Sequence, residues 1–334
     1  MQVRSLKAAA LGVLIACAGS SPAYAQATST GAGRDYPTKP IRFVVGFTAG
    51  GASDITSRII GQKLTERLGQ PVIIDNRAGA SGTIAGGIVA KAPPDGYTML
   101  SGATSILAIN PGLYAKLDYD SLRDFAPVSQ TVSMPQLLVV HPAVKATNLK
   151  ELLALAKARP GELNYASSGT GSSSHMAMEL LKFMAGINVV HVPFKGSGQA
   201  MPALLAGQVQ VVFDPMPSSL PHVKAGRLRA IAISTAARSP AIQELPTVAE
   251  SGVPGYESSL WYGVLLPART PPAIVAKLNQ TINAILRDPD VTERFAGLGA
   301  DPMGNSSAEF GKYIGTEVVK WGKVIKAVGI RADQ

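Results

Sequence analysis

The sequence predicts an α/β protein made of two lobes, each with a mostly parallel sheet flanked by helices. Three observations lead to this prediction. Segments with the apolar patterns of strands and of helices alternate along most of the chain. The alternation is interrupted once, near Pro127, before a second alternating series begins. The chain is also 334 residues long, which is more than one hydrophobic core comfortably serves.

The first series has the order strand, helix, strand, helix, strand. We expect strands at residues 41–47, 72–74 and 97–100, with helices at 55–68 and 83–91 between them. Strands joined through helices need right-handed crossovers. The three strands are therefore expected to be parallel neighbours in one sheet.

The second series follows a crossing between the lobes. Two strand candidates, at 128–132 and 137–141, flank a short segment that contains Pro135. Further elements are then expected, namely helices at 149–158, from 175 onward and at 200–205, and strands at 163–166, 187–192, 209–213 and 230–234.

The last part of the chain is expected to return to the first sheet. A strand at 261–266 precedes two amphipathic helices, and Trp321 lies on the apolar stripe of the second helix. Burial on the protein's own sheet is the commoner use of such a stripe, so we expect Trp321 in the core rather than on a partner surface. The expected lobes are residues 36–136 with 259–334, and residues 137–258.

The N-terminus predicts export. Arg4 and Lys7 precede an apolar run at 8–18, and the small residues at 21–25 form a cleavage pattern, so residues 1–25 are interpreted as a signal peptide. The apolar run is too short to be a membrane anchor. Lipidation at Cys17 is the alternative, and we favour simple cleavage. Cys17 is the only cysteine, so the exported chain would have neither disulfides nor a thiol nucleophile.

The charge balance favours an anionic partner. The formal net charge is +9, and the signal peptide carries two of the positive charges. Lysine and arginine are scattered and aromatic residues make up only 6% of the chain, whereas nucleic-acid binding needs a basic stripe with interleaved aromatics. We therefore expect no nucleic-acid partner.

Two turns between a strand and a helix have the composition of anion sites. Residues 167–175 read SSGTGSSSH, and residues 47–54 read FTAGGASD. Free N–H groups at a helix start bind carboxylate or phosphate, and glycines let the ligand approach the backbone. Two such turns, more than a hundred residues apart, suggest one anion held between two lobes.

Catalytic and metal-binding patterns receive little support. The sequence has no G-x-S-x-G elbow, H-E-x-x-H, Walker A or G-x-G-x-x-G motif. A secreted hydrolase using a serine near His175 stays an alternative, although a histidine in a first helical turn more often faces solvent or a loop carbonyl. The four histidines are dispersed without a carboxylate cluster, so we expect no metal.

Three charged residues near the turns allow two interpretations each. Asp54 either shapes the first turn as a capping residue, which we favour, or binds an amino or hydroxyl group of the ligand. Lys195 either offers a cation to a second carboxylate or is a solvated turn lysine. Asp214 ends a strand where ligands of α/β sheets gather, and we favour a role in holding a neighbouring loop.

Several segments taken together resemble the Bug-type periplasmic solute-binding receptors of the tripartite tricarboxylate transporter class. The resemblance covers nearly the whole chain after the signal peptide, in order. It rests on the segments at 36–54, 70–85, 93–100, 164–175, 191–198, 204–214, 226–234, 245–257 and 261–271.

The resemblance implies a two-lobed Venus flytrap of the type II-like periplasmic-binding-protein fold, closing on a small carboxylate. In such receptors main-chain amides, hydroxyls and bridging waters hold the carboxylate. The implied contacts are Phe47, Thr48, Ala49, Gly50, Gly51 and Ser53 in one lobe, and Ser167, Ser168, Gly169, Thr170 and Gly171 in the other, with Asp54, Lys195 and Asp214 as further candidates.

The expected function is therefore capture of an organic acid in the periplasm for a tripartite tricarboxylate-type transporter, without chemistry or cofactor, by a monomer. Dicarboxylates, amino-acid-like acids and aromatic acids all fit a backbone-lined site. The first turn departs from the family pattern, because Thr48-Ala49 stands where proline is common and Ser53 where threonine is common. A ligand-sensing partner of a signalling protein would share the same pocket and remains a further alternative.

Overall fold

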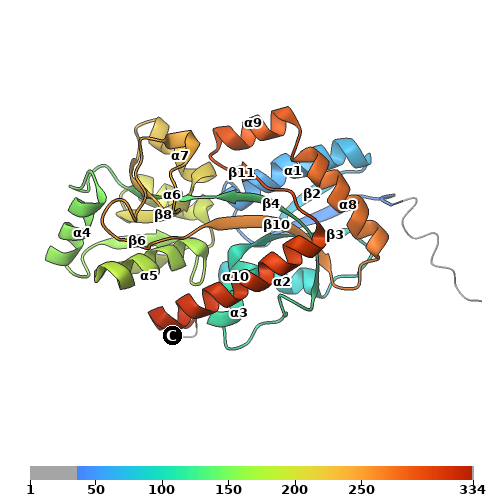
Figure 1. Ribbon diagram of the computed structural model, residues 1–334, viewed down its shortest axis with the longest axis horizontal. Helices are drawn as coiled ribbons and strands as arrows, with labels where there is room; N and C mark the ends of the chain where they lie inside the picture. Colours follow the sequence, from blue (N-terminus) through green and yellow to red (C-terminus); the bar gives the residue numbers. More distant parts are fainter. Residues whose placement is uncertain (1–35, 333–334) are drawn as a thin grey trace, which may run out of the picture. The chain divides into compact units, whose positions relative to one another are not determined.

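The structure is a computed structural model that describes residues 36–332. Two sheets with helices packed around them form this part of the chain, which confirms the two-lobed α/β fold (Figure 1). The sheets are mixed rather than mostly parallel, because β10, β4 and β11 in the first and β5 in the second pair antiparallel with their neighbours. The predicted signal peptide and Cys17 lie outside the described residues. No helix within residues 36–332 is long and apolar enough to cross a bilayer.

The first sheet has six strands. Its order across the sheet is β11 (Asp301–Pro302), β4 (Phe125–Met134), β10 (Leu260–Pro267), β3 (Thr98–Ala103), β1 (Ile41–Val45) and β2 (Val72–Asn76). β1 pairs in parallel with both β2 and β3, as the first series predicted. β10 is the strand expected to return to this sheet, and it pairs antiparallel with β3 and β4.

The second sheet has five strands. Its order is β7 (Val190–Pro193), β6 (Asn164–Ser167), β8 (Val211–Pro215), β5 (Gln136–Val140) and β9 (Arg229–Ile233). β6 is parallel to β7 and β8, whereas β5 is antiparallel to β8 and β9. β5 follows β4 after one residue, Pro135, so the chain enters this sheet directly from the first and runs against its parallel strands.

The helices divide between the two sheets. The first has α1 (Ala52–Leu68), α2 (Thr83–Ala90), α3 (Asn110–Leu113), α8 (Pro272–Ile285), α9 (Pro289–Gly297) and α10 (Ser307–Val328). The second has α4 (Leu149–Ala158), α5 (Ser173–Ala185), α6 (Ser197–Leu205) and α7 (Met216–Lys224), the green to yellow helices of Figure 1. A π-helical turn, η2 (Ser105–Ile109), follows β3, and 3-10 turns lie at η1 (Ala80–Gly82) and η3 (Pro240–Ile242).

α10 is anchored to the first sheet by tryptophan. The indole N–H groups of Trp261 on β10 and of Trp321 on α10 both donate to Glu317 Oε2, at 3.0 and 3.3 Å. All three side chains are buried. The predicted burial of Trp321 is confirmed, and the shared acceptor leaves neither indole N–H without a partner, which a buried donor requires.

Candidate functional site

A cavity with about 330 Å³ of empty space lies between the two sheets. Its first wall is made by Phe47 and the start of α1, by Ala103 at the end of β3 with Ser105 shortly after it, and by Leu260 and Tyr262 on β10. β1 and β3 end at this wall, and the antiparallel β10 begins there. The carboxyl ends of parallel strands are where open α/β sheets bind ligands.

The second wall has the same construction. It consists of Ser168 after β6, Ser172 and Ser173 at the start of α5, Ser197 at the start of α6, and Pro215 at the end of β8. Carboxyl ends of strands from both sheets therefore face one cavity, and four of these five residues carry a hydroxyl.

Three helices begin at the cavity. α1 and α6 have glycine N-caps, Gly51 and Gly196, without a side-chain hydrogen bond to their first turns. α5 is capped by Ser172, whose hydroxyl accepts from His175 N–H and leaves the preceding helical N–H groups open. The first N–H groups of a helix have no acceptor within the helix, and each helix start has a partial positive charge of about +0.5. The lining contains no charged side chain, so helix starts and hydroxyls set its electrostatics.

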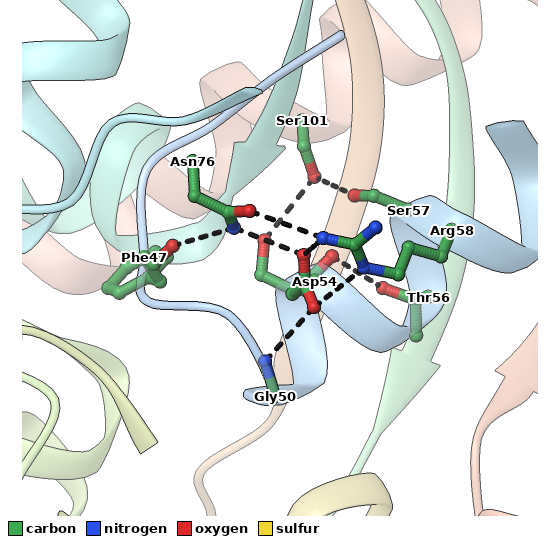
Figure 2. Close-up of polar contacts among 9 residues, drawn as sticks. Phe47, Gly50, Asp54, Thr56, Ser57, Arg58, Asn76 and Ser101 are labelled. Atoms are coloured by element: carbon green, nitrogen blue, oxygen red, sulfur yellow. Dashed lines mark hydrogen bonds and ion pairs between the residues drawn. The ribbon is translucent and has the colours of Figure 1, made fainter. Parts of the chain in front are cut away.

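Asp54 holds the turn at residues 47–54 in place and does not line the cavity. Its carboxylate accepts from Gly50 N–H at 3.0 Å, from Asn76 Nδ2 at 3.1 Å and from Arg58, which also forms an ion pair at 2.9 Å (Figure 2). Asn76 Nδ2 also donates to the Phe47 carbonyl at 3.0 Å, which ties β2 to the same turn.

The electrostatics of Asp54 agree with this role. Burial alone would raise the pKa of the carboxyl, but the hydrogen bonds from Arg58, Gly50 and Asn76 outweigh burial and lower it. These contacts support the interpretation that Asp54 shapes the turn. Asp54 is not the N-cap residue of α1, however. The cap position belongs to Gly51, and Asp54 reaches back from the first turn of α1.

Two stacked histidines support the second turn from behind. Ser167 Oγ accepts from Gly169 N–H at 3.1 Å and shares a hydrogen bond with His191 Nε2 at 2.6 Å. His175 Nδ1 accepts from Gly171 N–H at 3.1 Å. The two rings stack with centroids 4.2 Å apart, and Tyr165 stacks on His191. Each imidazole is thus hydrogen-bonded to the turn.

Both imidazoles are neutral at physiological pH. Burial, followed by the charge of Lys182, lowers the pKa of His175 to about 4. Burial, followed by His175, lowers the pKa of His191 to about 3. The expectation that His175 faces solvent or a carbonyl is wrong, because the ring is buried and accepts from an N–H. The serine paired with a histidine is Ser167, which is fully buried, and its partner is His191.

The turns of the two sheets also touch each other. Ser81 Oγ donates to the Thr170 carbonyl, and Asn110 Nδ2 donates to the Ser81 carbonyl. On the other side of the cavity, a Cβ on Gly198 would lie 2.0 Å from the Ala49 carbonyl oxygen. Direct backbone contact therefore joins the first turn to the start of α6.

The predicted site residues fall into three groups. Phe47, Gly51, Ser53 and Ser168 line the cavity. A larger group belongs to the same turns but packs beside the cavity, namely Thr48, Ala49, Gly50, Asp54, Ser167, Gly169, Thr170 and Gly171. Lys195 is exposed and outside the lining, and Asp214 is buried directly before the lining residue Pro215.

Several lining residues were not predicted. Ala52, Ser172 and Ser173 lie within the two turns at 47–54 and 167–175, and Ser197 lies in the segment at 191–198 on which the resemblance rests. Ala103, Ser105, Pro215, Leu260 and Tyr262 reach the cavity only because strands far apart in the sequence end at one place. No local pattern marks them.

Two other kinds of site find less support within residues 36–332. A larger hollow lies over residues 111–124, but Asp118, Asp120 and Asp124 in its lining outnumber the one basic residue, Arg123, so its net charge opposes an anion. No cluster of three or more histidine, cysteine or acidic residues that could hold a metal ion occurs in this part of the chain.

Comparison with known proteins agrees with the geometry. The model of the tripartite tricarboxylate transporter family receptor matches residues 56–330. The structure of Rpa4515 from R. palustris with adipate has a TM-score of 0.87 and 40% identity, covering 89% of this chain and 99% of that one. The periplasmic binding protein BugD has a TM-score of 0.86 and 32% identity over 89% and 99%. MatC from Rhodopseudomonas palustris with bound malate has a TM-score of 0.84 and 33% identity over 87% and 100%.

Proposed function

Because the chain belongs to the tripartite tricarboxylate transporter receptor family, whose members are periplasmic solute-binding proteins, we propose that it captures a small organic carboxylate for uptake by a transporter of that class. The observation that carries this proposal is the cavity itself. Three helix starts and several serine hydroxyls surround it without a charged side chain. This arrangement favours an anion through hydrogen bonds and helix dipoles.

A carboxylate is the anion that the related proteins support. Rpa4515 was solved with adipate and MatC with malate, and both ligands are dicarboxylic acids. The cavity is small, because only about 20 Å³ of its space can hold the centre of a water molecule. It suits a small acid better than a nucleotide or a peptide.

The binding residues are proposed from the same geometry. Phe47, Gly51, Ser53 and Ser168 contact the acid, together with Ser172, Ser173, Ser197 and Tyr262. The remaining predicted residues of the two turns act by shaping these contacts and by closing the lobes on each other. The proposed lobes stay at 36–136 with 259–334, and at 137–258.

We further propose that the acid leaves unchanged. The receptor family is one of solute-binding proteins, and the only serine hydroxyl of residues 36–332 that hydrogen-bonds a histidine ring, Ser167, is fully buried and outside the cavity lining. Neither the hydrolase nor the signalling alternative gains support from the comparisons. Export through residues 1–25 to the periplasm and action as a monomer complete the proposal.

A thermal-shift screen of the chain from Gln26 tests the function. Dicarboxylates, amino-acid-like acids and aromatic acids are compared with the diamides and diamines of the same carbon skeletons. An acid at 100 times its dissociation constant stabilises the folded protein by about 2.7 kcal/mol, so binders raise the melting temperature clearly. A response to phosphorylated or cationic compounds alone would show that the carboxylate assignment is wrong.

A further inference from the structure

We propose that Asp214 couples the capture of the acid to the uptake of a proton from solution. This inference rests on the proposed function, since it concerns the same cavity and the same ligand. It also narrows the ligand class to acids that place no cationic group beside Asp214.

The first observation is the position of the carboxyl group. Asp214 lies on β8 immediately before the lining residue Pro215, and only 1% of it is exposed. The hydroxyl of Ser197, a lining residue at the start of α6, lies close enough to influence this carboxyl. Oδ1 is buried without a hydrogen-bond partner. A buried, unpartnered carboxyl oxygen directly behind the cavity wall is costly and needs an explanation.

The second observation is that the Ser218 hydroxyl has one proton and two neighbouring acceptors. Ser218 Oγ makes a short contact with Asp214 Oδ2 and lies 2.9 Å from the Pro215 carbonyl. Its single proton can serve only one of these acceptors. If Asp214 is protonated on Oδ2, the carboxyl donates to Ser218 Oγ and Ser218 donates to Pro215. The protonated form makes both contacts of Ser218 as hydrogen bonds. In the ionised form Ser218 donates to Asp214 alone, and the Pro215 carbonyl keeps its hydrogen bond from Ser219 Oγ at 3.0 Å.

The third observation is the lack of a compensating charge. The groups that face Asp214 are Ser197 on α6, Ser218 on α7, Leu137 opposite on β5, and Tyr262 on β10. Tyr262 is the titratable one, and burial together with the charge of Asp214 raises its pKa. No ion pair of Asp214 occurs within residues 36–332. Burial accordingly raises the pKa of Asp214 to about 6, against the opposing influence of the nearby Ser197 hydroxyl and of the hydrogen bond with Ser218.

These observations set the sign of the coupling. Without ligand, Asp214 is mostly ionised at pH 7.5, because its pKa of about 6 lies below this pH. An acid anion in the cavity adds a second negative charge nearby and raises that pKa further, so the complex binds a proton that the free protein lacks. Affinity should be nearly constant below pH 6 and fall as the pH rises above it. A ligand ammonium group beside Asp214 would have the opposite effect and release a proton.

Isothermal titration calorimetry measures this proton directly. The chain from Gln26 is titrated at pH 7.5 with adipate and, separately, with malate, in phosphate and in Tris buffer, whose ionisation enthalpies differ. We expect uptake of about half a proton or more per acid bound, and affinity at least about fivefold weaker at pH 8.5 than at pH 6. Equal binding enthalpies in the two buffers, or release of a proton, would overturn the proposal.

Variants assign the proton to its residue. Asp214→Asn keeps a neutral side chain of the same shape, and we expect it to abolish both the proton uptake and the pH dependence of affinity. Asp301→Asn is the matched control, because burial also raises the pKa of Asp301 but this residue does not line the cavity. It should behave as the wild type. Uptake that persists in a folded Asp214→Asn protein would overturn the assignment.

Two further outcomes are decisive. If Asp214→Asn does not fold, the carboxyl ¹³C signal of Asp214 in the wild type is titrated with and without adipate, and a pKa that does not rise with ligand refutes the coupling. If neither adipate, malate nor any acid of the thermal screen binds, the proposed function is wrong and this inference falls with it. Binding without proton uptake contradicts the inference alone.

Discussion

Gly198 lies where the two halves of the site meet without room for a side chain. A Cβ there would lie 2.0 Å from the Ala49 carbonyl oxygen and 3.0 Å from Thr48 Oγ1. The first of these atoms belongs to the backbone and cannot rotate away. The contact between the turn before α1 and the start of α6 therefore requires glycine at this position. The helix itself does not require it.

Gly198→Ala is expected to weaken acid binding by about tenfold or more, because the methyl group holds the turns apart when the lobes close. The melting temperature without ligand should change little, since alanine favours the helix. Calorimetric titration with the best acid of the screen and a thermal melt measure the two effects. Gly315→Ala in α10 is the control, because a Cβ there meets no atom within 4 Å. Wild-type affinity in Gly198→Ala would show that the contact is not needed.

For single residues, the sequence predicts which residue types form the site better than it predicts which residues line the cavity. The two glycine- and serine-rich turns were recognised from the residue types that helix starts need, and four of their predicted residues line the cavity. Tyr262 and Pro215 carry no such signal, because only the topology of the sheets brings them to the cavity. Lys195 was proposed as a candidate for its charge, and the structure exposes its side chain away from the lining.

The turn between β1 and α1 is held by one side chain of its own helix. Asp54 connects Gly50 of the turn, Asn76 at the end of β2 and Arg58 one helical turn later (Figure 2). Removing the carboxylate leaves Gly50 N–H without this acceptor and breaks the hydrogen bond from Asn76, so that β2 stays joined to the turn only through the bond from Asn76 to the Phe47 carbonyl. Loss of the carboxylate should therefore lower the stability of the lobe and change the geometry of the site.

Asp54→Ala is expected to lower the free energy of unfolding by about 1–3 kcal/mol and to weaken acid binding. Urea denaturation measures the stability, and titration of the remaining folded protein measures the affinity. Asp118→Ala removes an acid whose ion pair with Lys91 is exposed on the surface, so it should cost less than about 1 kcal/mol and leave binding unchanged. Equal effects of the two substitutions would contradict the special role of Asp54.

Whole elements were predicted where their apolar pattern is regular. The strands around residues 41–47 and 261–266 and the two C-terminal helices follow such patterns, and each is present. α7 was not anticipated, because Pro217 and Pro221 suggest an interrupted helix. Pro217 lies in the first turn, where the missing N–H has no intrahelical partner in any case. The antiparallel direction of β5 follows from its direct connection to β4, which no pattern within β5 indicates.

The hydrogen bond of Ser81 matters for the arrangement of the whole molecule, because it joins the two lobes, whereas most other hydrogen bonds lie within one lobe. Its hydroxyl donates to the Thr170 carbonyl, so it joins a turn of the first sheet to a turn of the second. Contacts of this kind exist only when the turns meet. They change the balance between open and closed arrangements, and through it the apparent affinity for the acid.

Ser81→Ala removes this hydrogen bond while leaving both sheets intact. A hydrogen bond contributes about 0.5–1.5 kcal/mol, so we expect acid binding to weaken by about two- to tenfold, with a faster dissociation rate. Small-angle X-ray scattering should show a larger radius of gyration for the variant than for the wild type at subsaturating acid.

Ser251→Ala is the matched control, because Ser251 Oγ donates to the Thr247 carbonyl within one lobe. It should lower the melting temperature without changing affinity, since that bond is the same whether the turns meet or part. Equal affinity in Ser81→Ala and the wild type would mean that closure depends on the acid and on the Gly198 contact, and not on this bond.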